Sequence, residues 1–474
     1  FNGALAQFPP VLTASTCPVS CAPMTSCVVH IDVDAFFAQV EEALDASLAD
    51  KPVGVQQNFE VASVNYAARK FGLWNRMTVA EARSLCPELL LVQGDNSVNG
   101  MQRYRRASQQ VLRVIMGEVQ ALLGTETSLA GRSATWQGRR VENPSFDDFY
   151  ILFDTAMAKT WQRSCHVSGS SSPSSVLFDD ANSWALHCRK QILQQTKLKC
   201  SAGVASTKLL SSLATKVNKP NGQHCIYFGS EVSFLESVKV SDVKGAGLKG
   251  IPPELRSALL KELGEASTVG KLSNLLKRAS PSWLTADNAI LLQKIVSDGD
   301  DGSQVSVFEL PRSVSMELNV RPSNFEPCRC ASRIENGFQE LASVLLQRAL
   351  EDEQTYGVRQ CSSLIAKWKL FGNRARETHQ RQVAWPGKSA SLRGVSAALV
   401  ASTAMRSFLD ATQGGRDLCI SRIVLAIHFA NEGPHGRASS SALPKRSMSQ
   451  PTIAQTFKRQ CVPAAVSDAI VIDD

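Results

Sequence analysis

Residues 27–41, CVVHIDVDAFFAQVE, contain the change of periodicity that decides the fold. The first part is a short run of apolar and β-branched residues, which is typical of a buried strand. From Phe36 to Leu44 apolar residues then recur with helical spacing. A strand therefore passes directly into a helix, and Asp32 and Asp34 stand at the junction. Because side chains alternate along a strand, these two carboxylates would share a face unless the break at the helix separates them.

A second acidic pair stands far along the chain. Ser145-Phe146-Asp147-Asp148 precedes the apolar run 149–153. If neighbouring strands bring Asp32 and Asp147 together, they form an oxygen-rich site suited to Mg²⁺. A pair of such ions activates a hydroxyl and neutralises a leaving pyrophosphate. Adjacent acidic residues are more often solvated turn residues, and residues 177–180, LFDD, have nearly the same local pattern, so spacing alone does not identify the catalytic pair.

Composition narrows the class of protein. The 474 residues carry 51 Lys and Arg against 43 Asp and Glu, a modest net charge of +8. The 13 cysteines lack C-x-x-C pairs, which argues against a disulfide framework or a structural zinc and favours a reduced, intracellular compartment. We expect no membrane partner, because no apolar run approaches the length of a spanning helix. Residues 1–26 lack the pattern of a signal peptide, and we expect them to be disordered or non-native.

Periodicity predicts the remaining elements. Residues 124–140 and 166–175 are rich in Gly, Ser or Thr and are predicted to be inserted loops. Residues 229–307 show short helices, and a βαββαβ order follows. Beyond Glu432 the composition predicts a disordered tail. The predicted strands are 149–153, 200–205, 313–320, 362–371, 379–385 and 418–429. The predicted helices are 79–86, 101–123, 183–195, 207–217, 332–351 and 395–411.

Five ordered motifs resemble those of Y-family DNA polymerases. Residues 29–41 resemble the first motif of the family, and residues 141–148 resemble its second carboxylate motif in a divergent form. The others are KPVGVQQ at 51–57 with NYAARKFG at 65–72, SAGVASTKLL at 201–210 and KPNG at 219–222. The resemblance covers residues 27–432. Within the family, residues 54–57 and Phe146 are most similar to the iota branch.

The resemblance implies an α+β multidomain fold, the right-hand polymerase. The implied domains are a palm at 27–50 and 99–228, fingers at 51–98, a helical thumb with a helix-hairpin-helix at 229–310, a βαββαβ little finger at 311–432 and a tail at 433–474. It also implies primer-template DNA and dNTP as substrates, a nuclear location, and low-fidelity, distributive translesion synthesis.

The resemblance also assigns the metal ligands. Asp32, Asp147 and Asp148 are the implied catalytic carboxylates, and the backbone carbonyl of Val33 assists in holding two Mg²⁺ ions. Asp148 stands where the family usually has Glu, so its side chain is one methylene shorter. This difference would favour Mn²⁺ over Mg²⁺ or a looser catalytic centre. Asp34 matches an acidic position of less direct role.

Six residues match positions that contact the incoming nucleotide. Tyr66, Arg69 and Lys219 match the triphosphate contacts, and their chemistry suits that role. Phe37 matches the aromatic residue that stacks under the sugar and excludes a ribose 2′-hydroxyl. Phe36 stands beside it and is also expected in the helix core, and Gln57 falls in the segment that roofs the nascent base pair.

Further motifs concern DNA and protein partners. Gly245 and Gly247, followed by Lys249, resemble a helix-hairpin-helix turn, whose glycines let the backbone approach a phosphate. The cations of the βαββαβ segment that are expected to bind DNA, or else to form a solvated face, are Lys367, Lys369, Arg374 and Arg376.

The tail resembles two short binding segments. Residues 450–459, QPTIAQTFKR, resemble a sliding-clamp box in which Gln450, Ile453 and Phe457 match and Thr456 replaces an aromatic residue. Residues 470–474 resemble a strand that binds a ubiquitin-like modifier. Two alternatives remain open at this stage: another branch of the family, such as eta or kappa, and a catalytically inactive scaffold that binds DNA and the clamp.

Overall fold

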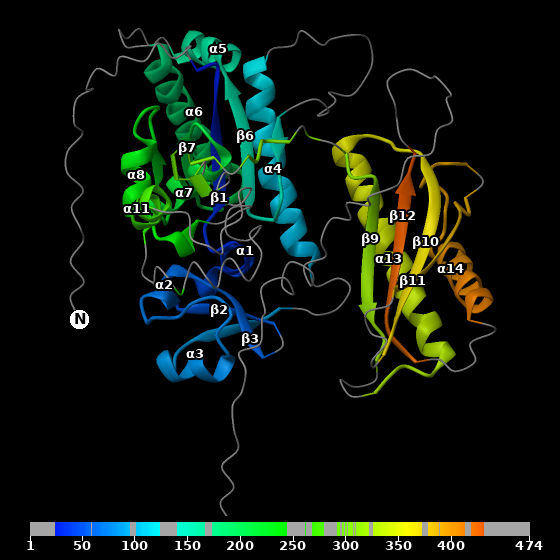
Figure 1. The fold of residues 1–474 in the computed structure, drawn as a ribbon. Helices are drawn as coiled ribbons and strands as arrows, with labels where there is room; N and C mark the ends of the chain where they lie inside the picture. Colours follow the sequence, from blue (N-terminus) through cyan, green and yellow to red (C-terminus); the bar gives the residue numbers. More distant parts are fainter. Residues whose placement is uncertain are drawn as a thin grey trace, which may run out of the picture. The chain divides into compact units, whose positions relative to one another are not determined.

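The protein is described from a computed structural model, and its strands form three sheets of five, four and three strands (Figure 1). The description covers residues 24–430 apart from 58, 95–100, 124–139, 166–172, 244–260, 262–267, 279–291, 294–295, 298, 301, 307, 309, 322–325, 372–377, 388 and 413–418. Among the helices so described, none has the length and apolarity needed to cross a membrane. The mixed α+β class expected from the sequence is confirmed.

The five-stranded sheet has the junction strand at its centre. Its order is β5-β6-β1-β7-β8, and β1 runs antiparallel to both of its neighbours. The strands are β1 (Ser26–Val33), β5 (Val141–Glu142), β6 (Asp148–Asp154), β7 (Cys200–Ala205) and β8 (Gln223–Cys225). The predicted strands 149–153 and 200–205 are thus confirmed. Every residue of β7 is buried, which explains its unbroken apolar and small-residue sequence.

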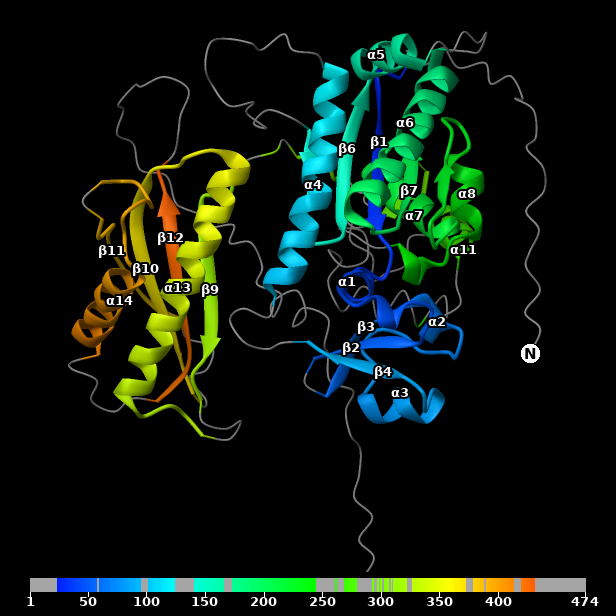
Figure 2. The same cartoon turned by 180° about the vertical axis from the view of Figure 1, so that it is seen from behind.

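Helices cover both faces of this sheet (Figures 1 and 2). Val29, Ile31 and Val33 pack into one core with α4 (Gln102–Leu123) and α6 (Pro173–Thr196). The opposite face, which carries His30 and Asp32, is covered by α7 (Lys208–Val217), because Gly203 lets that helix approach closely. A Cβ atom at Gly203 would lie 2.1 Å from the carbonyl oxygen of Ser211. The remaining helix next to the sheet is α5 (Thr155–Cys165).

The three-stranded sheet has the order β3-β2-β4 and lies beside the helix that follows β1. Its strands are β2 (Val53–Gln57), β3 (Glu60–Val64) and β4 (Leu90–Gln93), and its helices are α1 (Phe36–Leu44), η1 (Ala46–Leu48), α2 (Tyr66–Arg69) and α3 (Val79–Leu85). A capping box between Thr78 and Glu81 begins α3. Periodicity predicts this helix but not the sheet, whose strands are only four or five residues long.

The four-stranded sheet confirms the βαββαβ order. It is antiparallel with the order β11-β10-β12-β9, and both of its helices pack on one face (Figure 2). The elements are β9 (Ser313–Asn319), α13 (Ala331–Tyr356), β10 (Cys361–Leu370), β11 (Thr378–Ala384), α14 (Ala397–Ala411) and β12 (Ile420–Phe429). Leu364, Ala366 and Trp368 face the helices, so Lys367 and Lys369 share the other face.

Along the chain, short helices follow the last strand of the five-stranded sheet and precede the first strand of the four-stranded sheet, as the sequence predicts. They are α8 (Glu231–Ser237), η2 (Val240–Asp242) and α11 (Val269–Arg278). Leu235, Val240, Val269 and Leu272 bury their side chains in a separate small core. This core also includes Leu209 and Leu213 of α7, which ties the short helices to the five-stranded sheet.

One sequence prediction was wrong. The loop predicted at 166–175 ends earlier, because α6 begins at Pro173 rather than at residue 183. Proline is favoured in the first turn of a helix, where its missing N–H costs nothing. Leu177, Phe178, Ala181 and Trp184 are fully or almost fully buried at helical spacing, and their burial extends the helix through the polar residues between them.

Candidate active site

The pairing of β1 with β6 brings the two acidic segments together. Asp32 lies directly opposite Asp148, and His30 lies opposite Tyr150, so all four side chains share one face of the sheet. Asp147 comes one residue before β6, and its carbonyl oxygen accepts a hydrogen bond of 2.9 Å from the Val33 N–H. The sequence predicted the pairing of Asp32 with Asp147, and the register shows Asp148 to be the direct cross-strand partner.

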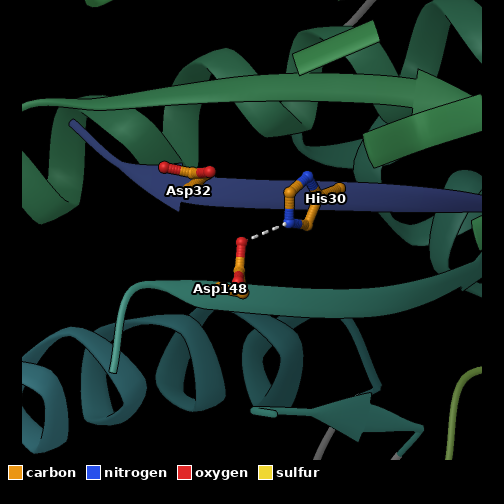
Figure 3. A group of neighbouring side chains, drawn as sticks. All are labelled: His30, Asp32 and Asp148. Carbon is orange, nitrogen blue, oxygen red and sulfur yellow. Dashed lines mark hydrogen bonds and ion pairs between the residues drawn. The ribbon is translucent and has the colours of Figure 1, made fainter. Parts of the chain in front are cut away.

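A buried histidine completes this cluster (Figure 3). His30 is 1% exposed, and its Nε2 lies 3.1 Å from Oδ1 of Asp148. The other ring nitrogen, Nδ1, lies 2.7 Å from the hydroxyl of Thr215 on α7, and the ring stacks on Tyr150. One ligand atom each from His30, Asp32 and Asp148 lie within 4.8 Å of one another, a spacing that would suit a metal ion.

Ser145 holds the acidic pair from the other side. Its hydroxyl oxygen lies 2.6 Å from Oδ1 of Asp147 and 2.9 Å from Oδ2 of Asp148. Burial and the charges of Asp148 and Asp32 raise the pKa of Asp147 to about 7. Burial also acts to raise the pKa of Asp148, but bonds from His30 and Ser145 outweigh it and lower that pKa to about 2. The surroundings therefore shift the pKa values of the two neighbours in opposite directions.

Lys219 is the cation nearest to the carboxylates. Its ammonium donates a hydrogen bond to Asp32 and lies 3.7 Å from Asp34. Burial raises the pKa of Asp32, and the Lys219 charge opposes that rise. Asp34 is 2% exposed and accepts bonds from the Ser201 hydroxyl, at 2.9 and 3.0 Å, and from the Asn221 N–H, at 2.7 Å. Asp34 therefore joins β7 and the segment around Lys219 to the end of β1.

The donor set of the cluster fits a divalent metal. Asp32, Asp147 and Asp148 offer carboxylate oxygens next to one another, which is the chemistry that Mg²⁺ and Mn²⁺ prefer. Asp34 lies beside them, and within this group of acidic residues the Lys219 ammonium contacts Asp32 and Asp34. Bringing like charges this close costs free energy that bound cations would offset.

The residues expected at the triphosphate lie next to this cluster. Tyr66 begins α2, and the guanidinium of Arg69 lies 4.7 Å from the centre of its ring. Burial raises the pKa of Tyr66, and the charges of Asp34 and Lys219 also act on it. The structure thus brings together Tyr66, Arg69 and Lys219, which are separated by up to 153 residues in the sequence.

The two phenylalanines of α1 differ in exposure. Phe36 is 2% exposed and belongs to the core, whereas Phe37 is only partly buried and packs against that core. Phe37 meets Tyr104 edge to face at 4.7 Å and Phe146 at 6.2 Å. Gln57, at the end of β2, is half-buried, and its amide contacts the sulfur of Met101 at 3.8 Å. Of the two phenylalanines, Phe37 is the one that is partly exposed.

The second Phe-Asp-Asp pattern lies elsewhere in the fold. Asp179 and Asp180 are on α6, where Asp179 accepts a bond from the Tyr227 hydroxyl and Asp180 from the Gln162 amide. Because Asp179 and Asp180 lie in a helix, neither can be the cross-strand partner of Asp32 in the sheet. The pairing of β1 with β6 therefore identifies Asp147 and Asp148 as the acidic pair next to Asp32, which local sequence alone could not do.

Several expected DNA and protein contacts lie outside the described residues. These are Gly245, Gly247, Lys249, Arg374, Arg376, the clamp-box residues Gln450, Ile453 and Phe457, and the terminal segment 470–474. Lys367 and Lys369 are described, half-buried on β10, and Lys369 lies opposite Arg422 of β12.

Sequence reasoning missed the polar side chains that hold the carboxylates. His30 could have been found, because it precedes Asp32 by two residues on a strand and must share its face. Ser201 and Thr215 carry no such local signal, since their partners are 167 and 185 residues away. The position of Tyr104 in an amphipathic helix predicts only that its side chain is buried in the core.

The sequence is similar to those of known proteins. The model of the impB/mucB/samB family matches residues 31–123 and 128–216. DNA polymerase iota of Homo sapiens is 29% identical over 357 residues, which are 74% of this chain and 45% of that protein. DNA polymerase IV of Shewanella oneidensis is 28% identical over 333 residues, 69% of this chain and 79% of that protein. The chain thus spans less than half of the human protein and most of the bacterial one.

Proposed function

We propose, from the premise that this chain belongs to the Y family of DNA polymerases, that it extends a DNA primer by template-directed transfer of nucleotides from dNTP. The reaction would be translesion synthesis, of low fidelity and distributive. The resemblance to polymerase iota supports an iota-like enzyme. The cluster of Asp32, Asp147 and Asp148 beside Lys219 is the observation that carries the proposal, because such a cluster serves no evident structural need.

The three sheets suit the parts of a right-hand polymerase. We assign the five-stranded sheet to a palm (27–50 and 99–228) and the three-stranded sheet to fingers (51–98). The short helices would belong to a thumb (229–310), and the four-stranded sheet to a little finger (311–432). The carboxylates around the end of β1 and the guanidinium of Arg69 on α2 support this assignment, since acidic and basic groups would then lie where the proposed palm meets the proposed fingers.

Asp32, Asp147 and Asp148, with the carbonyl of Val33, would hold two divalent ions, Mg²⁺ or Mn²⁺. When bound, such ions favour deprotonation of the primer 3′-hydroxyl and neutralise the leaving pyrophosphate. The protein orients these ligands through Ser145 and His30. The shorter arm of Asp148, fixed by His30 at 3.1 Å, keeps its carboxylate close to β1.

Tyr66, Arg69 and Lys219 would bind the triphosphate. Arg69 can fork two phosphate oxygens, and Lys219 supplies a point charge. Lys219 would exchange its bond to Asp32 for one to a phosphate, which is also negatively charged, and the Asp32 carboxylate would then be available to a metal ion. Phe37 would lie under the sugar, and Gln57 beside the nascent base pair.

Lys367 and Lys369 support a DNA-binding face on the four-stranded sheet, because both project from the face that its helices leave free. The sliding clamp and a ubiquitin-like modifier remain proposed partners of the tail, and the nucleus the proposed location.

Primer extension on an undamaged template, with the metal and the template base varied, tests the proposal. We expect extension with Mg²⁺ or Mn²⁺, and a strong dependence on the template base if the enzyme is iota-like. A gel-shift assay on the same DNA serves as the control. Tight DNA binding without extension under either metal would identify a scaffold instead of an enzyme.

A further inference from the structure

Phe37, which the proposed function places under the sugar, packs against a buried tyrosine from a different helix. Tyr104, on α4, is 1% exposed, and its ring meets the ring of Phe37 at 4.7 Å with an interplanar angle of 77°. An edge-to-face contact of this kind is the preferred geometry for two aromatic rings. The contact therefore restricts rotation of the Phe37 ring.

The tyrosine is itself tethered to the same face of α1. Glu41 follows Phe37 by four residues, one helical turn, so both side chains lie on one side of the helix. The Tyr104 hydroxyl bonds to the Glu41 carboxylate, and Arg103 closes the network with Nε at 2.7 Å from the same carboxylate. Glu41 is only 6% exposed. Burial raises the pKa of Tyr104, so the hydroxyl stays protonated and donates.

We propose that Tyr104 is a positioning residue that sets the discrimination between deoxyribose and ribose. Its ring holds the ring of Phe37, and its hydroxyl is in turn held by the Glu41 carboxylate. The inference rests on the proposed function, since Phe37 must lie under the nucleotide sugar. Tyr104 does not touch the substrate. It acts by denying Phe37 the small rotation that would admit a 2′-hydroxyl.

A second ring supports the same face. Phe146 lies 6.2 Å from Phe37 and 6.1 Å from Phe36, and it directly precedes Asp147. Among the described residues, loss of the Tyr104 ring would therefore leave Phe37 with one aromatic neighbour outside its own helix, Phe146, in place of two. A looser Phe37 would tolerate ribose while still supporting a deoxyribose.

Single-nucleotide insertion of dNTP and rNTP by Tyr104→Leu, Tyr104→Phe and wild type tests this. For Tyr104→Leu the ratio of kcat/KM for dNTP over rNTP should fall about tenfold, equivalent to about 1.4 kcal/mol, within the range for an aromatic pair. The fall should come mainly from better use of rNTP. Tyr104→Phe keeps the ring and should stay within about threefold of wild type.

Val119→Ala is the matched control. Val119 is 3% exposed near the far end of α4, so its truncation destabilises the same helix without touching Phe37. Its ratio should equal that of wild type. An unchanged ratio in Tyr104→Leu, or an equal fall in Val119→Ala, would overturn the inference. If wild type inserts neither nucleotide, the proposed function fails and the inference falls with it.

Discussion

Replacing Asp147 by asparagine should stabilise the metal-free protein most at alkaline pH, by less at pH 5, and not at all below the unfolded-state pKa of 3.8. The pKa of Asp147 is raised from 3.8 to about 7 by burial and by its acidic neighbours. A carboxyl whose pKa is raised on folding favours the folded state while it is protonated. That contribution is fully present below the unfolded-state pKa and is lost as the pH rises through about 7. Asparagine has nearly the same shape and never ionises.

The magnitude follows from the shift. A rise of about 3 pKa units corresponds to about 4 kcal/mol between the two protonation states. Solvent reaches the cluster, since the Asp148 side chain is 35% exposed, so we expect about half of that, about 2 kcal/mol. In a domain of about 150 to 250 residues, 1 kcal/mol shifts Tm by about 2 to 4 °C, so the substitution should raise Tm by about 4 to 8 °C.

Thermal unfolding in EDTA at pH 8 and pH 5 is the assay. Asp50→Asn, at an exposed turn position with a positive φ that asparagine tolerates, is the control and should shift Tm little at either pH. A Tm for Asp147→Asn at pH 8 that is equal to or below that of wild type would refute the reasoning. So would an equal gain at pH 5, because the effect would then not depend on ionisation.

Three further predictions concern the site and the DNA face. His30→Ala should weaken Mn²⁺ binding, measured by electron paramagnetic resonance, by about tenfold or more, because the Asp148 carboxylate loses its anchor; His30→Asn should recover part of the loss, and equal affinity in all three proteins would contradict the anchoring role. Lys219→Met should lower kcat/KM for dNTP by about ten- to a hundredfold, the worth of a charged hydrogen bond, with Lys219→Arg intermediate; unaltered steady-state kinetics would exclude Lys219 from the triphosphate. Lys367→Ala and Lys369→Ala should each reduce the slope of log affinity for duplex DNA against log salt by about 0.9, whereas Lys190→Ala, on the exposed side of α6, should not; slopes equal to wild type in all three would reject a phosphate track.

Local sequence was sufficient to predict the elements whose formation depends mainly on their own residues. The strand β1 and the helix α1 follow from the switch of periodicity at Ala35, and β7 from an unbroken buried run. The start of α6 was missed because residues 166–175 are polar, while the burial that stabilises its first turns comes from a core formed by distant segments.

In the candidate site too, local sequence identifies some residues, and others join only through tertiary contacts. The two acidic segments could be recognised from their patterns, but the pairing of Asp32 with Asp148 depends on strand register, which local patterns do not determine. His30, Ser201 and Thr215 join the site through contacts across more than 160 residues of sequence. Such contacts exist only once the sheet and α7 have packed together.

The central claim, that Asp147 belongs to the catalytic metal site, is tested most directly by a comparison that the chain itself offers. Phe146-Asp147-Asp148 and Phe178-Asp179-Asp180 share one local sequence, but the first leads into β6 and the second lies in α6. Primer extension by Asp147→Asn and Asp179→Asn, with DNA binding measured in parallel, separates them. We predict that Asp147→Asn binds DNA but does not extend the primer, while Asp179→Asn extends it as wild type does. Full extension by Asp147→Asn would contradict the account.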